Sequence, residues 1–458
     1  MKNLIRAALG IVFVCAASPA LAVSVEVDTG GMGSDCSPGH AAGTCSLREA
    51  IAFINTQGTS SVHTITFASG VTTVTIQAPD LPDIVVPAAI TGPVTINCEA
   101  ASLGGEVPAA FAFTTAQSDG YRVDNLNLVG CETSDPRGGA AIYFNPTDGA
   151  STLTVDGVTI QDTEASAGPG GAIKIAASHT ADISNTVIEN ASAETYGGAI
   201  DNQGFLTLTN SRLENNSLIT STFSASNGAG AGLSSRLATT GGTALDGVVI
   251  TGNSAGGDNG GGIYAEMQFS ALSFTINNTL ISDNQAANGG GISIGLNGPI
   301  ELTNSTLSGN TADGGGSPGA EGSGGAIYLD AVNSNGAVFR ASNCTLSGNN
   351  ADFGAAIAAD PSVQKASAMT NCTIAFNGDG AGNGIEMPGT QLEKVFPGNT
   401  NNPFAKNLLV GNAPQNCTGL FDHLNDTNNS GSNLASASNF RISALGEAAT
   451  HVAGQVGS

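Results

Sequence analysis

The chain has 458 residues, with 63 glycines, no tryptophan, 11% charged residues and a formal net charge of −24. Small, glycine-rich sequence with few charges favours tightly stacked strands and disfavours a helical fold. The acidic balance excludes nucleic acid and anionic membranes as expected partners, and suits a secreted protein or one that binds divalent cations.

Residues 1–22 are expected to form an export signal. Lys2 and Arg6 precede an apolar stretch, and Ala20-Leu21-Ala22 is a small-x-small cleavage site before Val23. Removal of the two basic residues takes the net charge from −24 to −26. No later stretch is apolar enough to span a membrane, so we expect no transmembrane segment.

A short amphipathic helix is predicted near residues 45–55. Ser46 and Glu49, three residues apart, form a capping box. Leu47, Ile51 and Ile54 fall on one face of the helix. A rod of stacked strands has an apolar end and unpaired edges that must be covered, and this helix is a suitable cap for such an end.

An internal repeat of about 30 residues dominates the rest of the sequence. Each unit places a glycine cluster before a short run with apolar residues at period two, as in Gly260-Gly261-Gly262-Ile263-Tyr264-Ala265. Self-similarity at this period indicates a solenoid, and the long helical patterns of ankyrin or tetratricopeptide repeats are absent. We therefore predict an all-β fold, a right-handed parallel β-helix with the short N-terminal capping helix. The residues that match Ile263 are Ile142, Ile173, Ile200, Leu233, Ile292, Ile327, Ile357 and Ile385.

A polar residue closes each unit, where a short side chain can tolerate a left-handed backbone. We expect one equivalent position, occupied by Asp162, Asn190, Asn215, Asn253, Asn284, Asn310, Asn349, Asn377 and Asn412.

The cysteines indicate disulfides between coils. Cys344 and Cys372 occupy the same place in two successive units, where the strand spacing brings their Cα atoms near 5 Å. Cys98 and Cys131 are also about one coil apart, and Cys36 with Cys45 would close a local loop. Stacked free thiols are the alternative for the coil pairs. Cys417 is left over. The sequence contains no Cys-x-x-Cys motif, so a zinc site is not expected.

The heptapeptide from Cys45 to Ile51, Cys-Ser-Leu-Arg-Glu-Ala-Ile, resembles the signature of CSLREA-domain secreted proteins. The segments His63–Phe67, Leu81–Ile84 and Val94–Asn97 are similar to the first coils of that family, and residues 406–434 resemble its choice-of-anchor tail without the final anchor. The resemblance implies a bacterial exported β-helix of the pectate-lyase-like superfold, and it implies no activity. We expect secretion or display at the cell surface, with the periplasm as the alternative.

Four regions are expected along the chain. They are the signal peptide at 1–22, the cap and first coils at 23–120, the β-helix repeats at 121–412, and a C-terminal tail or cap at 413–458.

Candidate binding residues lie on the strands that follow the glycine clusters. If the residues equivalent to Ile263 point inward, the next residue points outward. That outward row contains Tyr143, Tyr264 and Tyr328, and a second row two residues later contains Glu266, Asp330 and Asp360. Tyrosines along a flat face could stack on sugar rings, with acids nearby for the hydroxyls. The alternative is that tyrosine simply suits half-buried strand positions.

Asp330 and Asp360 occupy the same place on successive coils, about 5 Å apart by strand spacing. Such a pair could hold Ca²⁺, which is the only cofactor we consider, and the same separation suits a retaining glycosidase. A solvated acidic strip is the alternative. The basic residues on this face, Lys174 and Arg236, lie far along the rod from Asp330.

The sequence favours a non-catalytic, monomeric protein that binds polysaccharide or cell-surface glycans along one face of a rod. The alternatives are a polysaccharide lyase or glycoside hydrolase of the same fold, and a structural component of the cell surface. No catalytic residue is assigned.

Overall fold

The computed structural model describes residues 22–378, except 31–34, 38–40, 60, 77–80, 99–108, 115–119, 148, 220–228, 239, 270–271, 296–298, 317–320, 331–337 and 361–367. Beyond residue 378 it describes residues 384–386 and four short strands. The predicted signal peptide and most of the predicted C-terminal tail, 413–458, lie outside the described residues.

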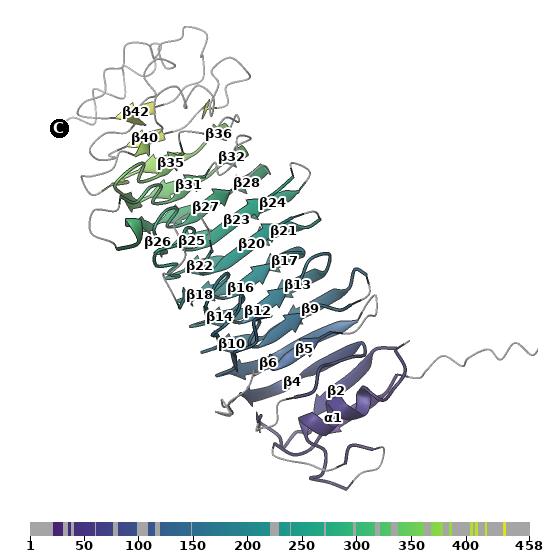
Figure 1. Cartoon of the computed structure of the whole chain (residues 1–458). Helices are drawn as coiled ribbons and strands as arrows, with labels where there is room; N and C mark the ends of the chain where they lie inside the picture. Colours follow the sequence, from purple (N-terminus) through teal and green to yellow (C-terminus); the bar gives the residue numbers. More distant parts are fainter. Residues whose placement is uncertain are drawn as a thin grey trace, which may run out of the picture.

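The fold is a parallel β-helix, as the sequence predicts. Figure 1 shows short strands stacked along a rod, with the single α-helix, α1 (Leu47–Ile54), at the N-terminal end. The strand pairs of the described residues are all parallel, and each strand pairs with its equivalents in neighbouring coils.

The largest sheet, sheet A, contains two columns of strands. One column follows the other within each coil, and the long strands β4 and β6 of the first coils span both columns. The strands of the first coils are β1 (Ser24–Val27), β2 (His63–Phe67), β3 (Thr73–Thr75), β4 (Ala88–Asn97) and β6 (Tyr121–Val129). The first column continues with β9 (Thr152–Asp156), β13 (Thr180–Ser184), β17 (Phe205–Thr209), β21 (Gly242–Asp246), β24 (Ser273–Asn277), β28 (Pro299–Thr303), β32 (Val338–Ser342), β36 (Ala368–Thr370) and β39 (Phe404–Ala405). The second continues with β10 (Thr159–Gln161), β14 (Val187–Glu189), β18 (Arg212–Glu214), β22 (Val249–Thr251), β25 (Leu280–Ser282), β29 (Thr306–Ser308), β33 (Thr345–Ser347), β37 (Thr373–Ala375), β40 (Leu408–Val410) and β42 (Leu434–Ser436).

Two further groups of strands complete the coil. Sheet B contains the strands that follow the glycine clusters, and two short ladders, sheet C, lie between sheets A and B along the chain. Sheet B is formed by β5 (Phe111–Phe113), β8 (Ile142–Phe144), β12 (Ile173–Ile175), β16 (Ile200–Asn202), β20 (Leu233–Leu237), β23 (Ile263–Met267), β27 (Ile292–Gly295), β31 (Ile327–Leu329), β35 (Ile357–Ala359), β38 (Ile385–Glu386) and β41 (Cys417–Thr418). Sheet C is formed by β7 (Glu132–Thr133), β11 (Glu164–Ala165), β15 (Ser192–Ala193) and β19 (Ser217–Leu218), and by β26 (Gln285–Ala286), β30 (Thr311–Ala312) and β34 (Asn350–Ala351).

Helix α1 covers the first coil, as expected of a cap. The Ser46 hydroxyl accepts a hydrogen bond from the Glu49 amide at 3.4 Å, which satisfies one of the free donors of the first turn. Leu47, Ile51 and Ile54 are fully buried and belong to the same apolar core as the coils. The helix packs against β1 and β2.

The three expected disulfides are all present. Cys36–Cys45, Cys98–Cys131 and Cys344–Cys372 have Cα separations of 4.6, 4.6 and 4.5 Å. The last two join successive coils. Disulfides persist in oxidising compartments, so these bonds indicate a location outside the cytoplasm. In the described part of the chain, no helix is long and apolar enough to cross a membrane.

The polar residues that close the coils occupy two adjacent positions, and the expectation of a single position is wrong. Asp162, Asn190 and Asn215 adopt the left-handed conformation, with φ near 54°. In the next four coils Gly252, Asp283, Gly309 and Gly348 adopt it. The asparagines of these later coils follow one residue after the left-handed residue and point inward.

The inward asparagines form a ladder along the rod. Asn284 is 1% exposed, and its Nδ2 donates to Ile250 O at 3.0 Å and to Asn310 Oδ1 at 2.9 Å. Its Oδ1 accepts from both the amide and Nδ2 of Asn253. A buried polar corner is thereby satisfied by the coils on either side. The members are Asn216, Asn253, Asn284, Asn310, Asn349 and Asn377.

Replacement of Asn284 by alanine is expected to lower the free energy of unfolding by about 3 kcal/mol or more, because several buried donors and acceptors lose their partner. Denaturant unfolding measures the change. Asn278→Gly is the control, since Asn278 is exposed, has a φ of 48°, and its side chain donates a hydrogen bond to Asp246 Oδ1 at the surface. Equal losses in the two variants would contradict a special role for the ladder.

Phe376 occupies the left-handed position of its coil, with a φ of 55° and a side chain that is 66% exposed. A residue with a Cβ atom in this conformation is strained by roughly 1–2 kcal/mol. We expect Phe376→Gly to raise the stability by about 1 kcal/mol in thermal unfolding, because strain is relieved and little buried area is lost.

The matched control for Phe376 is Gly348→Ala, at the same position one coil earlier. A Cβ atom there would meet only the Gly309 amide nitrogen, at 4.0 Å, so its expected loss of about 1 kcal/mol comes from the backbone conformation alone. A Phe376→Gly variant no more stable than the wild type would refute the strain argument.

Candidate functional site

The outward rows of sheet B are aligned as the sequence predicts. The residues equivalent to Ile263 pair with one another and are fully buried. The residues that follow them are consequently also in register from coil to coil, and the described members of this first outward row are Tyr143, Lys174, Asp201, Ser234, Tyr264, Ser293, Tyr328 and Ala358.

The first outward row is more buried than a flat exposed face would be. Tyr143 is 8% exposed and Tyr264 is 4% exposed, so neither ring offers a free face to a sugar. Only Tyr328 is partly exposed. The expectation that the tyrosines form an open stacking row is therefore wrong for two of the three, because neighbouring protein atoms cover their rings.

Tyr143 is held by the residues around it. The Arg137 guanidinium lies over its ring at 5.1 Å, and Ala109 and Ala112 pack against it. The Tyr143 hydroxyl accepts a hydrogen bond from Asn145 Nδ2 at 2.8 Å. These contacts give Tyr143 a packing role.

Tyr264 leans toward the next coil, where Gly295 leaves room for it. A Cβ atom on Gly295 would lie 3.0 Å from the Tyr264 hydroxyl oxygen. This hydroxyl is 3.5 Å from Glu266 Oε2. Burial raises the pKa of Tyr264 well above its usual range, and the negative charges of Glu266 and Asp330 add to the rise. The tyrosine therefore stays neutral, with its hydroxyl beside the Glu266 carboxyl group.

Tyr328, Asp330 and Asp360 lie together at the next coils. Asp330 and Asp360 each follow directly after paired strands, β31 and β35, which places them one coil apart as predicted. Burial raises the pKa of Tyr328, and the charges of Asp330 and Asp360 contribute. We call Tyr264, Glu266, Tyr328, Asp330 and Asp360 the acidic strip.

Within the part of the chain that the structure describes, no group of three or more His, Cys, Asp or Glu residues has a metal-binding arrangement. A Ca²⁺ ion at Asp330 and Asp360 would have to draw its remaining oxygen ligands from elsewhere. The calcium hypothesis for this pair stays a prediction.

Lys174 and Arg236, the two basic residues on this face, belong to one network of ion pairs and hydrogen bonds. Asp201 is fully buried on β16, and its carboxylate accepts from Lys174 Nζ on β12 and from Arg236 Nη2 on β20, the latter at 3.0 Å. The Gln203 amide oxygen accepts from Lys174 Nζ and Arg236 Nη2, both at 2.9 Å, in the orientation that the donors require. Burial lowers the pKa of Lys174, and the Asp201 charge opposes this effect.

Tyr196 completes this network and was missed by the sequence reasoning. Its ring lies 3.5 Å from the Arg236 guanidinium carbon. The turn at Gly197, with a φ of 62°, brings Tyr196 to the face just before β16, and a Cβ atom on Gly197 would clash with Ile200 O at 2.2 Å. The sequence signal that could have identified Tyr196 is its place directly before the glycine pair Gly197-Gly198. We call Lys174, Tyr196, Asp201, Gln203 and Arg236 the cationic cluster.

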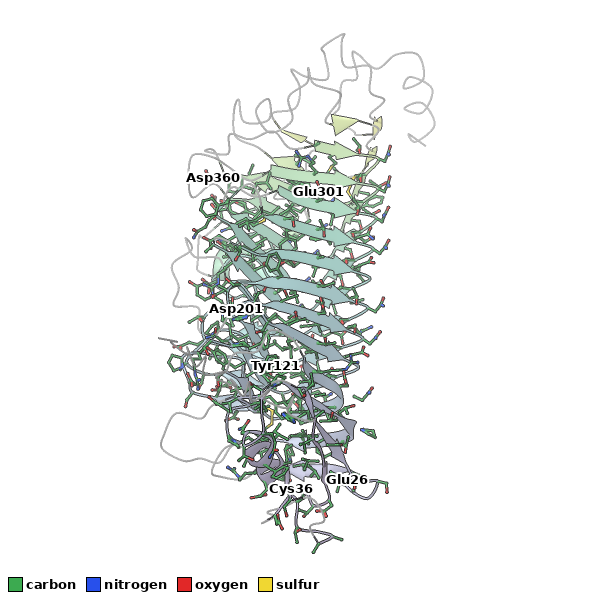
Figure 2. All side chains as sticks on the ribbon, turned by 90° about the vertical axis from the view of Figure 1, so that its right-hand side faces the viewer. Glu26, Cys36, Tyr121, Asp201, Glu301 and Asp360 are labelled. Carbon is green, nitrogen blue, oxygen red and sulfur yellow. A yellow bond between two sulfur atoms is a disulfide. The ribbon has the colours of Figure 1, made fainter. Side chains whose placement is uncertain are left out.

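The two groups share one side of the rod. Figure 2 shows Asp201, of the cationic cluster, and Asp360, of the acidic strip, along the same edge at different heights, and Glu301 on another face. Arg236 and Glu266 are register neighbours on β20 and β23, so the cationic cluster and the acidic strip meet there.

A buried carboxyl group off the face was also missed. Asp258, in the turn between β22 and β23, is 1% exposed, and neither of its oxygens has a hydrogen-bond partner. Burial raises the pKa of Asp258 to about 7. No motif surrounds Asp258 in the sequence, so only the packing of the turn identifies it.

The folded protein binds the Asp258 proton more tightly than the unfolded chain, whose aspartate titrates near 3.8. The stabilisation by this group is present below pH 4 and is lost as the pH rises toward about 7. We expect Asp258→Asn to melt at least about 2 °C above the wild type at pH 8, with a smaller difference at pH 4. Calorimetry across this range tests it. Exposed Asp182→Asn is the control, and a difference that does not grow with pH would contradict the assignment.

Comparison of the chain with protein-family models, with curated proteins and with solved structures finds no match.

Proposed function

We propose that this protein is an exported, non-catalytic rod that binds glycans along the outward face of sheet B. The observation that carries the proposal is the acidic strip, which puts carboxyl and hydroxyl groups of the β23, β31 and β35 coils on one face of the rod. Glu266, Tyr328 and Asp360 are partly exposed there and can accept hydrogen bonds from sugar hydroxyls. The CSLREA-like heptapeptide and the disulfides support a bacterial, exported setting.

The burial of Tyr143 and Tyr264 changes the expected mode of binding. Recognition would rest on hydrogen bonds to hydroxyl groups and on the one partly exposed ring, Tyr328. The groups of the acidic strip come from the coils of β23, β31 and β35, so they lie at multiples of the strand spacing of about 4.8 Å, which suits an extended polymer laid along the rod.

A glycoside hydrolase is the second candidate. Glu266 and Asp330 occupy equivalent positions two coils apart, on either side of the coil of Gly295. Two strand spacings amount to about 9.6 Å. This is near the upper end of the carboxyl separation in inverting glycosidases, about 6.5–9.5 Å.

The test measures retention of the exported protein on neutral and acidic polysaccharides, with and without Ca²⁺, together with the release of new chain ends. We expect retention without new ends, and about a tenfold loss of affinity in Glu266→Gln, because a charge-assisted hydrogen bond is removed. Glu301→Gln, the same change on the exposed face of sheet A, is the matched control and should bind as the wild type does.

New chain ends that disappear in Asp330→Asn would replace the binding proposal by the hydrolase. Loss of binding when Ca²⁺ is removed would assign the metal to Asp330 and Asp360. If the protein is retained on none of the polysaccharides, the binding proposal is refuted, and a structural role at the cell surface remains as the alternative.

A further inference from the structure

The cationic cluster brings two cationic side chains to a single carboxylate. Lys174 and Arg236 both bind Asp201, and their other polar partner is the neutral amide of Gln203. A buried or partly buried cation is unfavourable unless an anion compensates it. One positive charge of the cluster therefore lacks an anionic partner among the described residues, in a chain whose net charge is −24.

Part of Arg236 is available to a ligand. Its Nε and Nη2 atoms donate to Asp201, and one face of the guanidinium lies over Tyr196. Nη1 forms no hydrogen bond with the described residues, and the side chain is 20% exposed. The Asp201 and Tyr196 contacts fix the orientation of the guanidinium, which presents Nη1 in a preorganised position.

Glu266 forms no ion pair with Arg236. The two residues are register neighbours, but Arg236 forms its ion pair with Asp201. The face thus changes sign from positive at β12–β20 to negative from β23 onward. A polymer with a carboxylate on every sugar would gain contacts at the first half of the face and meet like charges at the second.

We propose that the cationic cluster is a carboxylate-binding subsite, and that this face selects glycans in which a carboxylated sugar alternates with neutral sugars. The inference rests on the proposed function and adds the class of ligand. Arg236 contacts the carboxylate, buried Lys174 adds positive charge behind it, and the acidic strip accepts hydrogen bonds from the hydroxyl groups of neutral sugars further along the same chain.

Hyaluronan oligosaccharides, which carry one carboxylate per disaccharide, test the proposal against the same oligosaccharides after reduction of the carboxyl groups. The wild type is expected to bind the carboxylated form at least about tenfold more tightly, because a charge-assisted hydrogen bond is lost on reduction. Polygalacturonate, with a carboxylate on every sugar, is expected to bind more weakly than hyaluronan.

Gln203→Glu is the decisive variant. A glutamate keeps both acceptor contacts to Lys174 and Arg236 but supplies the missing negative charge, so it should fold and lose the preference for the carboxylated form. Binding of the reduced form should not change. Arg236→Gln should also lose the preference, whereas Arg212→Gln, which removes an equal charge from an exposed pair with Glu214, should keep it.

Equal binding of the carboxylated and reduced forms by the wild type would overturn the subsite and leave the glycan-binding proposal in place. An unchanged preference in Gln203→Glu would do the same. Tighter binding of polygalacturonate than of hyaluronan would overturn the alternation of charged and neutral sugars. Retention of no glycan at all would refute both the subsite and the proposed function.

Discussion

The structure depends on one constraint: the buried polar groups at each corner of a coil must be hydrogen bonded by the coils above and below. In the asparagine ladder, the backbone N–H and Nδ2 of one asparagine both donate to Oδ1 of the next, and Nδ2 also donates to a backbone carbonyl. A shift of one residue in any coil would leave several of these groups without partners inside an apolar core, at a cost of about 1–3 kcal/mol for each group. The ladder therefore fixes the register as well as adding stability.

A fixed register allows coils of unequal length. Asn216 and Asn253 are 37 residues apart, whereas Asn284 and Asn310 are 26 apart, yet each pair makes the same bonds. The extra residues must leave the rod as loops between strands. Side chains from distant parts of the sequence consequently come to one face at a constant spacing, which is the property that an extended ligand could use.

The outward face of sheet B illustrates how this arrangement produces different local chemistry from similar coils. On β12, β16 and β20 the outward residues form a buried ion-pair network in which two cations share one carboxylate. From β23 onward carboxyl groups and tyrosine hydroxyls occupy the same rows, and burial keeps the tyrosines neutral. The boundary between the two halves falls between adjacent strands, so a ligand that crosses it would meet both kinds of group.

Sequence alone determined the fold, the capping helix and the inward and outward rows, because they follow from local periodicity and from the repeat length. The repeat length also predicted the two disulfides between coils, and the short separation of Cys36 and Cys45 predicted the third. The sequence determined the identity of the outward residues but could not determine their exposure. Tyr264 is covered because Gly295, 31 residues later, leaves space for its ring, and Asp201 is buried because Lys174 and Arg236 come from the coils on either side. The sequence pattern also did not separate the left-handed position of each coil from the inward ladder position that follows it. Asn215 and Asn216 are adjacent asparagines, and only the structure shows that Asn215 is left-handed and that Asn216 belongs to the ladder. Burial and the pairing of charges are properties of neighbouring coils, and only the tertiary structure decides which side chains become neighbours.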